Sequence, residues 1–117
     1  MKLNSSNPIL THVNISGNIA NEAGGIILYS SNPELNHVNI SGNNSEYGGG
    51  MTLFNGSSPT VENCIFRNNT GTIEGGGIHL RENCNPILVN CRFEDNVALG
   101  PGGGIFCLDN SNPTLLD

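Results

Sequence analysis

Acidic side chains are the first residues whose type and spacing could do chemistry. Glu22, Glu46 and Glu74 each lie shortly before a run of glycines, and Asp95 ends the segment Arg-Phe-Glu-Asp. Two carboxylates that face each other within about 5–9.5 Å can cleave a glycosidic bond. Carboxylate oxygens are also the ligands that calcium prefers. Asp95 and Glu74 are therefore the nearest candidates for catalysis, and the three glutamates are the nearest candidates for a cation site.

The same residues also fit a surface that does no chemistry. Glu94 and Arg67 occupy the same outward-facing position in two successive repeats of the sequence, and we call such a recurring position a column. This predicts an ion pair across neighbouring strands. Asp95 stands where a related segment has Gly42, and Asp and Gly both tolerate the backbone of a tight turn. An acidic edge also promotes solubility. We therefore assign no catalytic residue and no metal ligand from the sequence.

Histidine and cysteine offer metal chemistry, but their spacing argues against it. His12 and His37 share a position that continues as Asn63 and Asn90, so no third ligand follows them. Zinc and related metals need three or four converging ligands. We interpret this column as a set of corner residues and expect no cofactor.

The four cysteines contain no C-x-x-C pair. Cys64 and Cys91 lie 27 residues apart in one apolar column, whereas Cys84 and Cys107 belong to two other columns. Neighbours in register seldom reach the dihedral angle that a disulfide requires. We expect four free thiols that fill the core.

Aromatic side chains supply the other route to binding. Tyr29 and Phe54 share an outward column that continues as Arg81 and Leu108. Flat rings beside a cation are suited to holding sugars or protein surfaces. Tyr29, Phe54 and Arg81 are therefore the predicted binding residues, and the alternative is that this stripe packs under the loop before the next proline.

Composition limits the elements that could position these groups. The chain of 117 residues is 36% hydrophobic and 12% charged, with 16 glycines and no tryptophan, which favours strands and tight turns in a single domain, 1–117. The net charge of −6 argues against nucleic acid as a partner. No apolar run reaches spanning length, so membrane insertion is not expected.

A repeat organises the whole chain. Five of its six prolines fall at intervals of 25, 26, 27 and 27 residues, at Pro8, Pro33, Pro59, Pro86 and Pro113. An asparagine follows each of the first four prolines by ten residues, and a glycine run ends seven or eight residues later. The coils are predicted as 5–29, 30–54, 55–81 and 82–108, with a partial fifth coil at 109–117. Since neither end has a cap, we expect a segment of a longer array or end-to-end self-association.

The apolar positions within a unit predict three short strands. In the first unit, alternation at two residues marks 13–16 and 25–29 as strands with one face inward. The step of three from Leu10 to Val13 breaks the alternation, which predicts a strand at 9–11 and a corner at His12. Three strands per unit, stacked on those of the next unit, predict an all-β fold, the right-handed parallel β-helix.

Two further columns are predicted to hold the coils together. One is an asparagine ladder whose amides bond to one another and to the turn backbone, at Asn18, Asn43, Asn69 and Asn96. The other ends each glycine run, at Gly25, Gly50, Gly77 and Gly104.

These motifs carry a family resemblance. The pattern F-x-x-N at Phe66–Asn69 and Phe93–Asn96, each followed by Gly-Gly-Gly-Ile, is similar to the repeats of polymorphic outer-membrane proteins. The repeat as a whole resembles right-handed parallel β-helix proteins of the pectin-lyase-like fold. That fold is shared by adhesins, polysaccharide lyases, glycoside hydrolases and inert spacers, so the resemblance implies the fold more closely than any one activity.

The sequence favours a non-catalytic scaffold of a surface or secreted bacterial protein that binds proteins or glycans. An extracellular or cell-surface location accompanies this interpretation. The first alternative is a fragment of a carbohydrate-active enzyme, which would need converging acids on one distinctive coil. The second is a purely structural spacer that associates with copies of itself.

Overall fold

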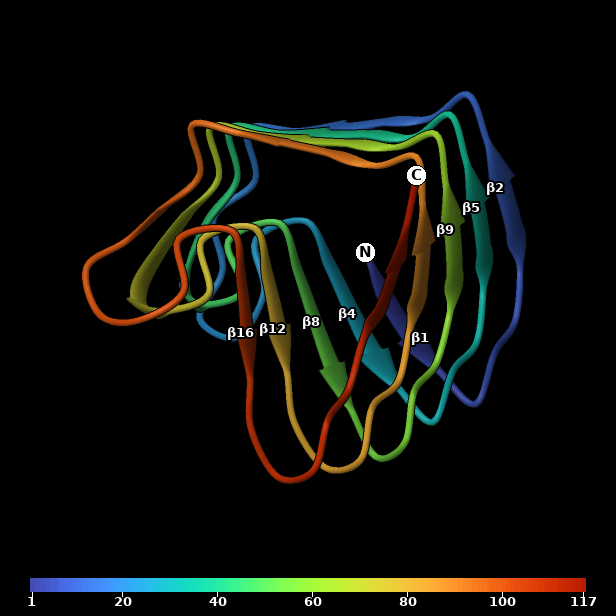
Figure 1. Cartoon of the computed structure of the whole chain (residues 1–117). Coiled ribbons are helices and arrows are strands. Elements are labelled where there is room, and N and C mark those ends of the chain that lie inside the picture. The colour runs from blue at the N-terminus through green and yellow to red at the C-terminus, as the bar shows by residue number, and fades with distance from the viewer.

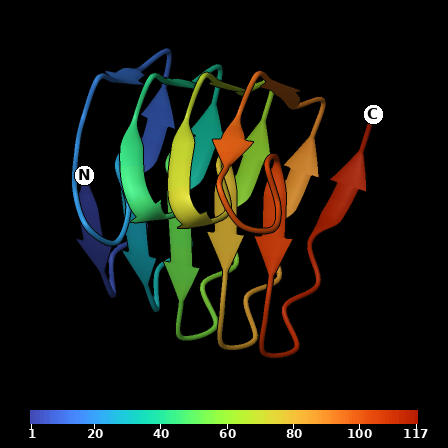
Figure 2. The same cartoon turned by 90° about the vertical axis from the view of Figure 1, so that its left-hand side faces the viewer.

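The computed structural model describes residues 1–117 and contains parallel β-strands without a helix (Figure 1). Equivalent strands of successive units lie side by side and form four sheets, which we name A to D. Figure 2 shows the coils following one another along the stack from the N-terminus to the C-terminus. No helix is present that could cross a membrane.

The strands of sheet A and sheet B form two of the walls of the stack. Sheet A contains β1 (Lys2–Asn4), β4 (Ile26–Tyr29), β8 (Met51–Phe54), β12 (Ile78–Leu80) and β16 (Ile105–Cys107). Sheet B contains β2 (Ile9–Thr11), β5 (Glu34–Asn36), β9 (Thr60–Glu62), β13 (Ile87–Val89) and β17 (Thr114–Leu116).

Two shorter sheets complete each coil. Sheet C contains β3 (Asn14–Ser16), β6 (Asn39–Ser41), β10 (Ile65–Arg67) and β14 (Arg92–Glu94). Sheet D contains β7 (Asn44–Tyr47), β11 (Thr70–Glu74) and β15 (Val97–Ala98).

Strand register confirms the repeat. In sheet B, Ile9 pairs with Glu34, Glu34 with Thr60, Thr60 with Ile87, and Ile87 with Thr114. These partners lie 25, 26, 27 and 27 residues apart, which are the intervals between the prolines. Matching positions of successive units therefore lie directly over one another.

The predicted corners and turns are confirmed by the backbone. The corner residues have a φ of 50° to 54°, at His12, His37, Asn63 and Asn90. The turn position that Asp95 shares with Gly42 also has positive φ in all four coils, at Gly17, Gly42, Asn68 and Asp95. These are the residue types that adopt a left-handed backbone at the lowest cost, so the chain changes direction there in every unit.

The core is a column of apolar side chains enclosed by sheets A, B and C. Fifteen buried residues form one cluster, which includes Leu28, Leu35, Ile40 and Phe66. Phe66 stacks on Phe93 in the next coil with ring centroids 4.9 Å apart. Each fully buried side chain of this size contributes about 1.5–3 kcal/mol, so the stacked column supplies most of the drive to fold.

Sheet D is the main departure from the three strands per coil that the sequence predicts. Its strands lack an alternating apolar pattern and place small inward residues, such as Ser45 and Gly71, against the stack. After sheet D, the glycine runs cross the outer side of sheet A. They cover a column of side chains that points away from the core, in which Thr52 and His79 are completely buried.

Candidate functional site

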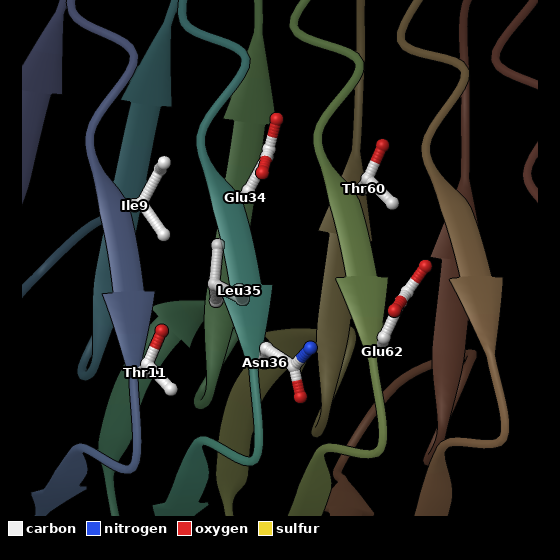
Figure 3. Close-up of a pocket in the computed structure, with 7 residues that line it drawn as sticks. All are labelled: Ile9, Thr11, Glu34, Leu35, Asn36, Thr60 and Glu62. Atoms are coloured by element: carbon white, nitrogen blue, oxygen red, sulfur yellow. The ribbon is translucent and has the colours of Figure 1, made fainter.

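The outer face of sheet B carries a trough between two rows of side chains. One row contains Ile9, Glu34 and Thr60, and the other contains Thr11, Asn36 and Glu62 (Figure 3). A hollow of about 310 Å³ lies between the rows.

Three-residue strands explain why the trough exists. The first and third residues of each strand point outward, and the middle residue points into the core. Leu35 occupies the middle position of β5 and is only 1% exposed, so the strand backbone forms the floor. Because the strands are in register, the outward residues of successive coils line up as two walls that run along the stack.

The trough is acidic. Glu34 and Glu62 lie on opposite walls, and neither takes part in a salt bridge. Of the four neutral outward positions, Thr11, Thr60 and Asn36 carry hydroxyl and amide groups, whereas Ile9 is apolar. Such a surface can attract a cation and can exchange hydrogen bonds with a hydroxyl-rich ligand.

The predicted binding residues do form a column on sheet A. The ring of Tyr29 stacks on Phe54 with centroids 5.2 Å apart, and Lys2 Nζ lies 5.0 Å from the Tyr29 centroid. Arg81 follows in the next coil, with its Nε 3.6 Å from Asp109 Oδ2. Both faces of the Tyr29 ring and one face of Phe54 are therefore covered, which leaves the second face of Phe54 and the ring edges for a ligand.

Glu22 holds Tyr29 in place. The Tyr29 hydroxyl donates a hydrogen bond of 2.7 Å to Glu22 Oε2. Desolvation, followed by this hydrogen bond, raises the pKa of Tyr29 to about 12. The phenol thus remains a proton donor at neutral pH.

The other acidic candidates are dispersed. Glu74 ends β11 and contacts His79, whereas Glu46 is exposed on β7. Asp95 lies in the exposed turn before β15, at the opposite end of sheet D from Glu74. No three His, Cys, Asp or Glu side chains gather in a way that could hold a metal ion.

The expected ion pair of Glu94 takes a different partner. Arg67 and Glu94 are in register, as predicted, but the carboxylate of Glu94 pairs with Arg92 of its own strand. Arg92 lies two residues from Glu94 and on the same face, so its side chain reaches the carboxylate without crossing to the neighbouring coil.

The four cysteines are free thiols, but the expectation that all of them fill the core is wrong for Cys107, which lies in the last full coil. Cys64 and Cys84 are buried, Cys91 is partly buried, and Cys107 is exposed in sheet A. The hydrogen bond with Cys91, together with burial, raises the pKa of the Cys64 thiol. Cys64 is therefore a neutral filler of the core.

His79 is the titratable group that the sequence analysis missed. It is fully buried beneath the glycine run, with Nε2 3.2 Å from Glu74 Oε2 and with Nδ1 lacking a partner. The rings of Tyr47 and Phe106 lie 5.5 and 5.7 Å away. Burial lowers the pKa of His79, although Glu74 opposes this shift. The sequence did contain a sign that this outward column is covered, because the same column holds the apolar residues Ile27 and Phe106.

We expect His79 to make the fold sensitive to acid. The folded state disfavours protonated His79, whereas the unfolded chain accepts a proton below its ordinary pKa of 6.5. The unfolded state thus binds more protons in this range, and the free energy of unfolding falls as the pH drops below 6.5. Urea titrations at about pH 7.5 and about pH 5, on either side of an ordinary histidine pKa, will measure this loss.

The His79→Phe variant, which copies Phe106 of the next coil, should lose less stability between the two pH values. His12→Phe is the control, because His12 is exposed at a corner. An acid-induced loss as large in His79→Phe as in the unmodified chain would contradict this role of His79.

Comparison with known proteins agrees with this architecture. The family model described as the right-handed beta helix region matches residues 2–117. The match is to the β-helix as such and is not specific to the repeats of outer-membrane proteins. No curated protein and no solved structure matches the chain. The stacked parallel coils and a match over almost the whole sequence together show that this chain belongs to the right-handed β-helix family.

Proposed function

We propose that this β-helix is a non-catalytic scaffold of a secreted or surface-exposed bacterial protein, and that it binds glycans through the trough on sheet B. The observation that carries this proposal is the pair of in-register walls, which present hydroxyl, amide and carboxylate groups around a hollow of about 310 Å³. Binding sites for sugars need several such groups in fixed positions, and a stacked sheet supplies them on a rigid support.

Catalysis is the second candidate, because the trough holds two carboxylates. Glu34 and Glu62 are one coil apart and offset by two strand positions, which places their Cα atoms about 8 Å apart by ordinary sheet spacing. From Cα atoms at this distance, two outward glutamate side chains can bring their carboxyl groups to the separation of about 6.5–9.5 Å that inverting glycosidases use. However, Glu34 is exposed on an open face, where nothing excludes water or sets one carboxyl apart as an acid. Binding without cleavage is therefore the better-supported function.

A glycan panel tests the proposal. We expect the purified chain to retain one or more glycans and to release neither reducing ends nor unsaturated products from them. Thr60→Arg would place a long side chain in the hollow and should lower retention at least tenfold, whereas Thr72→Arg, on the exposed side of sheet D, should not. Retention of no glycan, or retention that Thr60→Arg leaves unchanged, would contradict binding at this trough.

Product formation would favour the enzyme instead. Turnover that is lost in Glu34→Gln or Glu62→Gln would assign catalysis to the trough. Turnover that is lost only in Asp95→Asn or Glu74→Gln would move it to the residues that the sequence analysis selected.

A further inference from the structure

We propose that the trough on sheet B takes a linear glycan that carries amino groups, such as a polymer of glucosamine. This inference rests on the proposed function and narrows its ligand. It follows from the charge of the walls, from the positions of the two carboxylates, and from the hydrogen bonds that the backbone of the floor already makes to neighbouring strands.

The negative charge of the trough favours the binding of amino sugars over that of acidic sugars. Glu34 and Glu62 are the only charged residues that line the hollow. The chain has four Lys and Arg residues, and none belongs to sheet B, since three lie in β1, β10 and β14 and Arg81 directly follows β12. Lys2 lies over Tyr29, Arg81 faces Asp109, and Arg92 pairs with Glu94. An ammonium group is therefore attracted to the trough, whereas a uronate or a sulfate meets two carboxylates without a compensating cation.

The placement of the carboxylates fits a linear polymer. Glu34 belongs to one wall in the second coil, and Glu62 belongs to the opposite wall in the third coil (Figure 3). Coils rise by about 4.8 Å, the spacing of hydrogen-bonded strands, which is close to the length of one sugar in an extended chain. Successive sugars in a β-1,4-linked chain turn their substituents to alternate sides. Two successive amino groups would thus meet one carboxylate on each wall.

The backbone favours a glycan over a basic peptide. An extended peptide gains much of its affinity from main-chain hydrogen bonds with an open strand edge. In the floor of the trough, β5 pairs with β2 on one side and with β9 on the other. Its peptide groups are therefore already used, and only side chains remain as partners. Thr11, Asn36 and Thr60 can supply the hydroxyl and amide contacts that sugar hydroxyls need.

Matched oligosaccharides will test this inference. Binding of glucosamine oligomers, N-acetylglucosamine oligomers and galacturonate oligomers of equal length is measured by calorimetry, at a pH where the amino sugar is protonated. We expect the glucosamine oligomer to bind most tightly and to weaken as salt is raised, because screening acts on exposed charges. Glu34→Gln and Glu62→Gln should each weaken it by about threefold to tenfold, as for partly exposed charge-assisted hydrogen bonds.

The control variant is Glu46→Gln, which removes one charge from the exposed surface of β7. It should leave glucosamine binding unchanged. Equal binding of the acetylated and free amino oligomers, unaffected by Glu34→Gln and Glu62→Gln, would overturn the inference but leave glycan binding intact. Failure of every oligomer to bind would overturn the inference, and the glycan panel would then decide separately whether the trough binds any glycan. Polylysine that binds as tightly as the glucosamine oligomer, and that is weakened equally by the two variants, would show a general cation surface and would also overturn the choice of a glycan.

Discussion

Replacing Asn69 with alanine is expected to lower the free energy of unfolding by about 3–5 kcal/mol, because several buried polar groups lose their partners together. The Asn69 side chain is fully buried, and its Oδ1 accepts hydrogen bonds of 3.1 Å from the backbone N and from Nδ2 of Asn43. Its Nδ2 donates bonds of 2.9 Å to the carbonyl of Ile40 and to Asn96 Oδ1. The amide thus connects three coils.

Urea titration followed by circular dichroism will measure this loss. Asn18→Ala is the matched control, since Asn18 is exposed and only donates to Asn43 Oδ1. It should cost no more than about 1 kcal/mol, the usual net contribution of a hydrogen bond. Asn69→Asp should also be strongly destabilising, because a carboxylate can accept from Asn43 but cannot donate to Ile40. If Asn69→Ala and Asn18→Ala cost the same, the ladder is not a major source of stability.

The ladder was predictable because one residue type recurs at one position in four coils. The same argument located the corners, where His12 and Asn63 share a positive φ although their chemistry differs. In a stacked fold, a requirement of the backbone is repeated in every coil, and the sequence repeats the residues that satisfy it. The strand register and the turns can therefore be predicted from the sequence alone.

The cover over sheet A was not predictable in the same way. Sheet D has no alternating pattern, and the pairing of β7 with β11 shifts between Gly71 and Glu74. Its strands are held by backbone hydrogen bonds, which leave little trace in residue type. The burial of Thr52 shows the consequence, because its hydroxyl lies 2.8 Å from the carbonyl oxygen of Glu22 and 2.9 Å from that of Tyr47, in the covering segments of two successive coils, and its one hydrogen is donated to either of them.

The trough on sheet B also escaped the sequence analysis. Glu34 and Glu62 occur in different columns, and each resembles an isolated surface charge. They become neighbours across the trough only in the folded chain, where Glu62 lies one coil further along the stack and two strand positions away from Glu34. The aromatic column was easier to predict, since Tyr29 and Phe54 occupy one position in successive coils. Repetition therefore reveals structural columns more readily than a site built from residues that differ.

Gly50→Ala is expected to lower the free energy of unfolding by about 3 kcal/mol, the upper part of the usual range for an overpacked interior. A Cβ on Gly50 would lie 2.6 Å from the carbonyl oxygen of Gly77 in the next coil. That oxygen accepts hydrogen bonds from the backbone N of Gly50 and of Met51, so it cannot move away without breaking the contact between coils. Phe66 and Asn69 lie 3.2 Å from the same Cβ position and prevent a shift to the other side.

Gly104→Ala provides a control within the same column, because a Cβ there has no heavy atom within 4 Å. The two substitutions change the unfolded chain alike, so the difference between them measures the cost of the close approach in the folded state. Gly104→Ala should therefore change stability by less than about 0.5 kcal/mol, as is usual for surface substitutions. Urea midpoints of both variants test the prediction, and a Gly50→Ala variant as stable as Gly104→Ala would show that the coils can separate at this position without loss. The glycine run would then be explained by turn formation alone, whereas a large difference would assign it to the packing of one backbone against the next.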